Sequence, residues 1–216
     1  AQNLAGNEIE DVAVVRGAAI GALDAVVRRQ ELWGGAWRQR LALVAAAVTA
    51  RQVGRVEDEA ALRDAVLLTK AGDDVGPAGR MLLAWRRLAT CPVEDMLTEK
   101  NLRAMLEEFG HASDNKAVGD LTDELCRLFA GGIVGTLTGA FAAAERYGFG
   151  RAVGAWLADA LVAQALGWTH AVPLLGAEVI AGLGTSRPRR SETTLAAASI
   201  DEGGAQAKSA GEGEAG

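Results

Sequence analysis

Hydrophobic residues are concentrated in one stretch of the first half of the chain. Over residues 41–50 every side chain is apolar except that of Thr49. Gly34 and Gly35 precede this stretch and Gly54 follows it, which is typical of a helix that begins after the glycine pair and ends near Val53. A helix without a polar face has to be covered by other helices. The pattern therefore predicts a buried central helix around which the rest of the chain packs.

Apolar residues recur every three or four positions in the segments on either side, which predicts amphipathic helices. The predicted helical segments are approximately 9–30, 57–69, 77–89, 102–109, 118–129, 133–147, 151–166 and 173–179. No segment shows the strict alternation of a strand. The predicted fold class is all-α, an irregular multi-helix bundle wrapped around one buried central helix.

The composition changes from Thr185 onward to Ser, Gly, Ala, Glu and isolated charges. Such a segment buries too little apolar surface to offset the entropy lost on ordering it. The predicted organisation is an N-terminal flank over residues 1–8, one helical domain over 9–184 and a disordered C-terminal tail over 185–216.

Composition and charge restrict the classes of function. The chain has 216 residues, of which half are apolar, and a net charge of −6; an acidic chain of this kind is a poor candidate for general nucleic-acid binding. Its two cysteines form no C-x-x-C pair, which favours buried thiols in a reducing cytoplasm. The first residues lack the basic and then apolar pattern of a secretory signal. Because the uncharged runs 128–144 and 160–177 fall short of the roughly 20 residues that span a bilayer, no membrane insertion is expected.

No motif in the chain specifies a reaction. Residues 148–154 (GFGRAVG) resemble a glycine-rich phosphate loop, but an alanine-rich helix, not a strand, is predicted before them. His170 has no metal-ligating residue at a suitable spacing, and the break at Gly110 separates His111 from the acids around it. Asp159 lies in an apolar run and needs either a partner or an exposed position. We therefore expect no cofactor, no metal and no identifiable catalytic group among these residues.

Charged residues gather around the central helix. A candidate ligand or structural polar cluster consists of Arg40, Glu57, Asp58, Arg63, Asp64, Asp73, Asp74 and Arg80. These residues fall near the ends of consecutive helices, where short turns would bring them together. They could form a salt-bridge network that holds the helices, which is the favoured interpretation, or a ligand site. Between residues 28 and 87 there are eleven Arg and Lys against seven Asp and Glu, a local excess that leaves room for an anionic partner.

The turn over residues 73–80 is predicted to be a structural clamp. Asp73 or Asp74 would cap the following helix through its backbone N–H groups. Arg40 or Arg63 would then pair with the other aspartate, because two adjacent carboxylates repel each other unless a cation neutralises them.

Two hypotheses for the function follow from the sequence. The favoured one is a non-catalytic helical interaction or regulatory protein, which binds another protein or itself; binding to nucleic acid or a membrane is not expected. The alternative is a metal-dependent enzyme in which Asp64, Asp73 and Asp74 hold a divalent ion and Arg63 and Arg80 bind an anionic substrate.

Six runs of residues carry a resemblance to a known family. They are AWRQRLAL at 36–43, EDEAALRDA at 57–65, GDDVGPAGR at 72–80, LAWRRL at 83–88, WLAD at 156–159 and VPLL at 172–175. In these runs and their spacing the chain resembles the proteobacterial family catalogued as domain of unknown function 1403. The resemblance implies a bacterial, alphaproteobacterial protein but brings no activity, cofactor or site residue. It also implies further helices after Ala181, where this chain would be truncated or frame-shifted.

Overall fold

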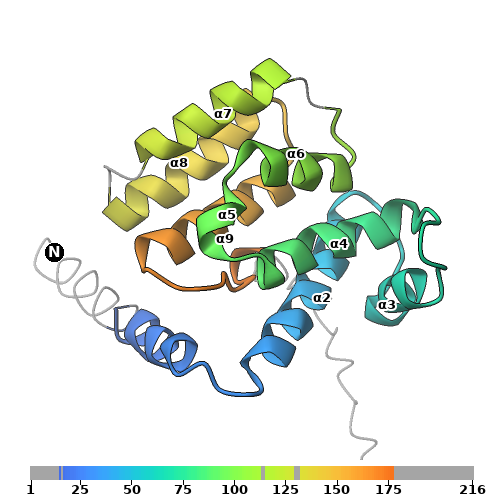
Figure 1. Ribbon diagram of the computed structural model, residues 1–216, viewed down its shortest axis with the longest axis horizontal. Helices are drawn as coiled ribbons and strands as arrows, with labels where there is room; N and C mark the ends of the chain where they lie inside the picture. The colour runs from blue at the N-terminus through green and yellow to red at the C-terminus, as the bar shows by residue number, and fades with distance from the viewer. Residues whose placement is uncertain (1–14, 16, 113–114, 129–131, 178–216) are drawn as a thin grey trace, which may run out of the picture. The chain divides into compact units, whose positions relative to one another are not determined.

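The computed structural model describes residues 15, 17–112, 115–128 and 132–177, and these residues form helices joined by short turns (Figure 1). The labelled helices are α2 (Gly34–Gln52), α3 (Glu59–Leu67), α4 (Gly76–Thr90), α5 (Val93–Met96), α6 (Glu99–Glu108), α7 (Asn115–Leu128), α8 (Gly132–Arg146) and α9 (Arg151–Ala165). Residues 17–28 are helical as well. Within the described residues the only β-type pairing is an isolated bridge between Pro92 and His170. The predicted all-α fold class is confirmed.

The predicted central helix is α2, and its second half lies in the core. Residues 42 and 45–50 are buried, and α4 packs along them. Thr49, the polar exception in this stretch, accepts a hydrogen bond of 2.9 Å from the indole N–H of Trp85 on α4. A buried hydroxyl that lacked a partner would destabilise the fold. Thr49 is therefore compatible with a core position because Trp85 meets it there.

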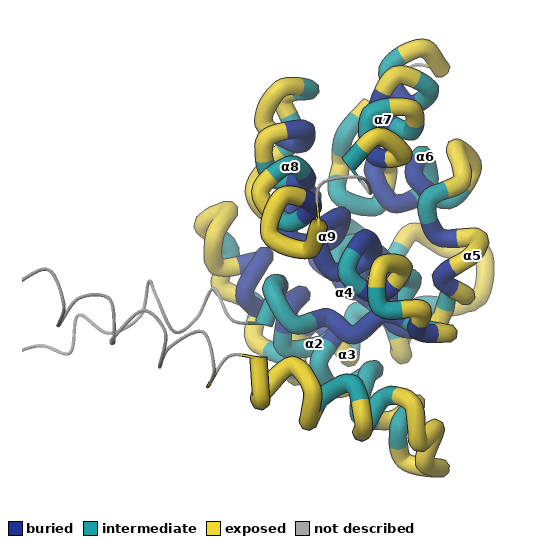
Figure 2. The backbone as a smooth tube through the Cα atoms, turned by 90° about the vertical axis from the view of Figure 1, so that its left-hand side faces the viewer, coloured by how far each residue is buried: buried dark blue, intermediate teal, exposed yellow. Residues whose placement is uncertain are grey.

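Helix α9 is enclosed even more completely than α2. Residues 153–161 are all buried, so that most of the helix is dark blue in Figure 2. Small side chains allow α8 to lie close to it: a Cβ atom at Gly154 would be 2.6 Å from the ring of Phe141 on α8. On another side, the indole N–H of Trp156 donates a 2.9 Å hydrogen bond to the Ala84 carbonyl of α4. The bundle thus has two buried helices, α2 and α9, and a hydrogen bond from a tryptophan indole joins each of them to α4.

The helix over residues 17–28 contacts this core along one side only. Leu23 and Val27 pack against it. The indole N–H of Trp168 donates to Asp24 at 2.8 Å, and Arg28 donates to the carbonyl of Leu166 at 2.6 Å. The two polar contacts therefore attach this helix to the turn that follows α9, and the two aliphatic side chains attach it to the core.

The predicted boundaries agree with the observed helices to within a few residues where they fall in the described part of the chain. Gly54 and Gly110, expected to stop α2 and α6, have positive φ angles of 76° and 84°, a conformation that glycine adopts without steric cost. The short helix α5 was not predicted. The tail over 185–216, the flank over 1–8 and the last two residues of the predicted helix 173–179 lie outside the described residues, and residues 175–177 are helical. The division into domains therefore stays a prediction.

Candidate functional site

The charged residues that precede and follow α3 make local contacts. Asp58 is the N-cap of α3, and its carboxylate accepts a hydrogen bond of 2.8 Å from the backbone N–H of Ala61. Glu57 pairs with Arg55 two residues earlier, and this hydrogen bond lowers the pKa of Glu57. Both acids thus act on their own segment: Asp58 satisfies a backbone donor at the start of the helix, and Glu57 neutralises a neighbouring arginine.

Two further ion pairs lie on the surface of α2 and α3. Arg40 of α2 approaches Glu59 of α3 at 3.2 Å, and Arg63 approaches the adjacent Asp64 at 3.0 Å. All four side chains are more than one third exposed. Exposed pairs of this kind contribute about 0–1 kcal/mol each. The Arg40–Glu59 pair joins two helices, as the favoured structural interpretation of the cluster supposed.

The turn before α4 differs in part from the predicted clamp. Asp74 accepts a hydrogen bond of 3.0 Å from the N–H of Gly76, the first residue of α4, so one aspartate does support the helix start. The expectation that Arg40 or Arg63 closes onto Asp73 is wrong, because those arginines are paired with Glu59 and Asp64. Asp73 is exposed, where water solvates its charge and removes the need for a cation.

The predicted cluster is therefore a series of local contacts along the surface and not one constellation. Within the described ranges, no three side chains of His, Cys, Asp or Glu come together in a way that could hold a metal ion. Arg80 makes no ion pair with another described residue, and it is half-buried. Asp58 and Asp74 lie at helix starts as expected, whereas Arg40, Arg63 and Asp64 lie within α2 and α3, and the sequence could not show which partner each residue meets.

Sequence reasoning missed a set of large aliphatic side chains around α3. Val53 and Val56 precede the helix, and Leu67 and Leu68 lie at its end; they are 59%, 95%, 63% and 81% exposed, respectively. We call these four residues the α3 surface. Leu62 is the only fully buried residue of α3, with Val66 partly buried beside the core, and the helix packs on α4 and α2. One feature of the sequence indicated this exposure. Leu67 and Leu68 are adjacent at the end of the helix, and a single helix face cannot bury two adjacent side chains.

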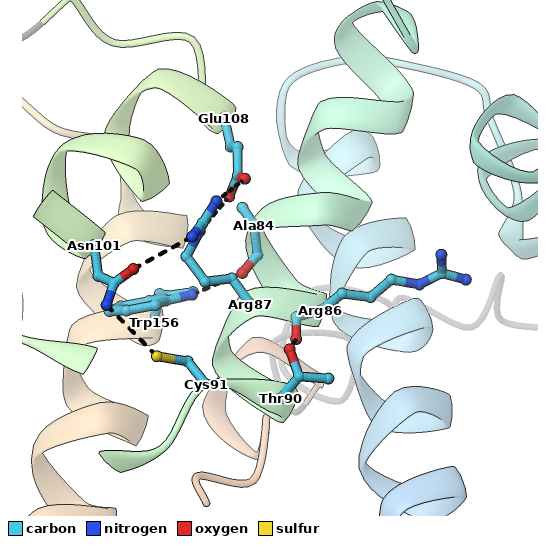
Figure 3. Close-up of polar contacts among 8 residues, drawn as sticks. All are labelled: Ala84, Arg86, Arg87, Thr90, Cys91, Asn101, Glu108 and Trp156. Carbon is cyan, nitrogen blue, oxygen red and sulfur yellow. Dashed lines mark hydrogen bonds and ion pairs between the residues drawn. The ribbon is translucent and has the colours of Figure 1, made fainter. Parts of the chain in front are cut away.

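A polar cluster that the sequence did not single out joins α4 to α6. Arg87 binds Glu108 through two hydrogen bonds, Nε to Oε2 at 3.0 Å and Nη2 to Oε1 at 2.5 Å. Asn101 accepts from Arg87 at 3.4 Å and donates to the carbonyl of Asp95 at 2.8 Å. Figure 3 shows Arg87 between Glu108 and Asn101, while Arg86 leaves α4 in the other direction. Because each of these groups has its partner inside the protein, the Arg87–Glu108 pair is an internal clamp.

The residues with nucleophilic or acid–base chemistry are also held in structural roles. Asp159 is buried on α9, and both of its carboxylate oxygens lie 3.1 Å from the backbone nitrogen of Leu175. The sequence predicted that Asp159 would need either a partner or an exposed position, and Leu175 is such a partner. Burial raises the pKa of Cys91 and lowers the pKa of His111. Burial, together with the charge of Arg38, lowers the pKa of His170. These shifts favour the uncharged forms of the thiol and of both imidazoles.

A surface cavity of about 670 Å³ lies between α8 and the start of α9. It is lined by Thr138, Phe141, Ala142, Ala144, Glu145, Phe149, Gly150 and Arg151. The guanidinium of Arg151 sits 5.7 Å from the ring centre of Phe141, a distance at which a cation and an aromatic ring attract each other. Helix α8, not a strand, precedes residues 148–154, of which 148–150 form the loop and 151–154 the first turn of α9. The loop therefore lacks the strand–turn–helix context of a nucleotide-binding site.

The fold and these contacts define an all-α protein whose identified polar contacts are structural. The chain belongs to the family described as "Protein of unknown function (DUF1403)", which matches residues 2–199. The family named from the six sequence runs is thus confirmed, and the match extends past Ala181, where a departure was expected. No curated protein and no solved structure matches the chain. None of the helices in the described part of the chain combines the length and hydropathy needed to cross a membrane.

Proposed function

We propose that this protein is a non-catalytic helical interaction module of the bacterial cytoplasm that binds another protein through the α3 surface. One observation carries the proposal: four large aliphatic side chains on a single short helix and its flanks are 59–95% exposed. We infer that these four side chains belong to one binding surface, because exposed apolar groups with polar groups around them are typical of binding sites for proteins. A helix of nine residues is about 14 Å long, so one partner segment can contact both ends of α3.

The predicted cluster supplies the polar border of this surface. The exposed Arg40–Glu59 and Arg63–Asp64 pairs lie on α3 and the helix beside it. Charges at the rim of an interface influence mainly the rate of association and the choice of partner. In this proposal the exposed pairs Arg40–Glu59 and Arg63–Asp64 orient the partner, whereas the aliphatic side chains provide the buried contact.

A cytoplasmic location agrees with the state of the two cysteines. Both cysteines are free, but the expectation that they are buried is wrong: Cys91 is half-buried and Cys126 is exposed. An exposed free thiol persists more readily in a reducing compartment.

The alternative of a metal-dependent enzyme gains no support from the geometry. Asp64 is occupied by Arg63, Asp74 binds the start of α4, and Asp73 is exposed. Thermal unfolding with and without millimolar Mg²⁺ or Mn²⁺ tests this alternative directly. A shift of several degrees that disappears in Asp73→Asn would favour the enzyme.

The interaction proposal is tested by substitution on the α3 surface. The full chain, with Val56→Lys or Leu68→Lys, is compared as bait with the wild type in a bacterial lysate, and the retained proteins are identified and purified for binding measurements. Val134→Lys on α8 is the matched control, because Val134 is 75% exposed and lies on another helix. We expect a protein that binds the wild type and the control but not the two α3 variants. If the variants retain the same proteins with the same affinity as the wild type, the proposal is wrong.

A further inference from the structure

The surface cavity between α8 and the start of α9 has the composition of a small-molecule site. The two helices lie side by side (Figure 1), and the cavity has a volume of about 670 Å³. Sites for small ligands usually measure about 300–1,000 Å³ and combine apolar walls with a few charged groups. Here the lining includes two aromatic rings, those of Phe141 and Phe149, together with the acid Glu145 and the base Arg151.

The aromatic walls of the cavity are held in place by other parts of the fold. The ring of Phe141 lies 2.6 Å from where a Cβ atom of Gly154 would be, so it rests directly on α9. Phe149 meets the ring of His111 edge-on, with ring centres 5.1 Å apart. The backbone N–H of Phe149 also donates to the Ala144 carbonyl at 2.7 Å. The rings thus line a preformed cavity, which reduces the entropy lost when a ligand binds.

The two charged groups of the cavity stand at helix ends that disfavour them. Arg151 is the first residue of α9, at the positive end of the helix dipole, and Glu145 lies in the last turn of α8, at the negative end. Both side chains are exposed, and neither forms an ion pair with a described residue. Helix α9 also has no acid in its first turn and no side-chain cap. Residues that oppose the local electrostatics without a compensating partner in the fold are expected at functional sites.

We propose that this cavity binds a free α-amino acid with a large apolar side chain. The carboxylate of the ligand pairs with Arg151 at the positive end of α9, and its ammonium group pairs with Glu145 at the negative end of α8. The apolar side chain of the ligand packs against Phe141 and Phe149. Each charge of the ligand thereby neutralises a side chain and a helix end together. A ligand with only one of the two charges would leave the other side chain without a partner.

The cavity lies on helices other than α3, so this proposal and the proposed function can fail independently. The test titrates the full chain with L-phenylalanine and with L-leucine by isothermal titration calorimetry. We expect saturable binding at one site with a dissociation constant of about 1 mM or below. Three probes then remove one group each: glycine lacks the apolar side chain, phenethylamine the carboxylate and N-acetyl-L-phenylalanine the ammonium group. Each of them should bind at least about tenfold more weakly than L-phenylalanine.

Substitutions at the two charges test where the amino acid binds. Arg151→Gln and Glu145→Gln should each weaken the binding of L-phenylalanine at least about tenfold. Neither should appreciably destabilise the unliganded protein in thermal unfolding, because each removes a charge from a helix end that disfavours it. The matched controls are Arg51→Gln on α2 and Glu94→Gln on α5. Both residues are exposed and lie on other helices, so these variants should bind L-phenylalanine as the wild type does.

Three results would overturn the proposal. The first is that neither L-phenylalanine nor L-leucine binds at millimolar concentrations. The second is that phenethylamine or N-acetyl-L-phenylalanine binds as tightly as L-phenylalanine, which would mean that the site recognises one charge alone. The third is that the cavity variants bind no more weakly than the two controls, which would place the ligand elsewhere on the protein.

Discussion

The clamp between Arg87 and Glu108 allows the most quantitative test of the structure. The two side chains are only 28% and 16% exposed and share two hydrogen bonds, and the bond to Glu108 raises the pKa of Arg87. Exposed ion pairs contribute up to about 1 kcal/mol. Removing one partner of a fully buried pair costs about 3–5 kcal/mol. For this half-buried, bidentate pair we expect a coupling energy of about 1.5 kcal/mol, between those limits.

The coupling is measured in a double-mutant cycle of Arg87→Ala, Glu108→Ala and the double variant, with urea unfolding at neutral pH. The cycle removes the loss of packing that each alanine causes by itself. The same cycle on Arg63 and Asp64 is the internal comparison. That pair is about half exposed and should couple by less than about 0.5 kcal/mol. If Arg87 and Glu108 couple no more strongly than the surface pair, they do not clamp α4 to α6 and the reasoning fails.

Three other perturbations test separate parts of the fold. Hydrogen bonding by Arg28 lowers the pKa of Asp24, so the carboxylate stabilises the fold at neutral pH and loses this contribution as the pH falls through its lowered pKa. The stability difference between the wild type and Asp24→Asn should therefore shrink between pH 7 and pH 3 in urea unfolding, and a constant difference would contradict the contact. Gly154→Ala places a methyl group 2.6 Å from the ring of Phe141 and should cost about 1–3 kcal/mol in the same assay; no loss would show that α8 and α9 are further apart. Leu62→Ala removes the one buried side chain of α3 and should cost about 2–5 kcal/mol, whereas a loss below 1 kcal/mol would mean that α3 is not anchored there.

Local signals in the sequence were sufficient to predict where helices begin and end. Gly54, Gly110 and Gly148 adopt positive φ angles two residues after the last residues of α2, α6 and α8. Asp58, an acidic residue directly before a helical run, caps α3. These effects act over a few residues, so they can be recognised without knowing the rest of the structure. The short helix α5 was not predicted, because four residues are too few to show the hydrophobic periodicity of a helix.

The tertiary structure decided which groups meet and which side chains remain exposed. The charges near α3 were identified from the sequence, but Arg40 meets Glu59 and Arg63 meets Asp64, and Asp73 is left in solvent. The α3 surface could not be distinguished from a core segment, because its four side chains are as apolar as those of α9. The physical reason is that helix formation depends on neighbours in the chain, whereas burial and ion pairing depend on which helix faces come together across distant segments.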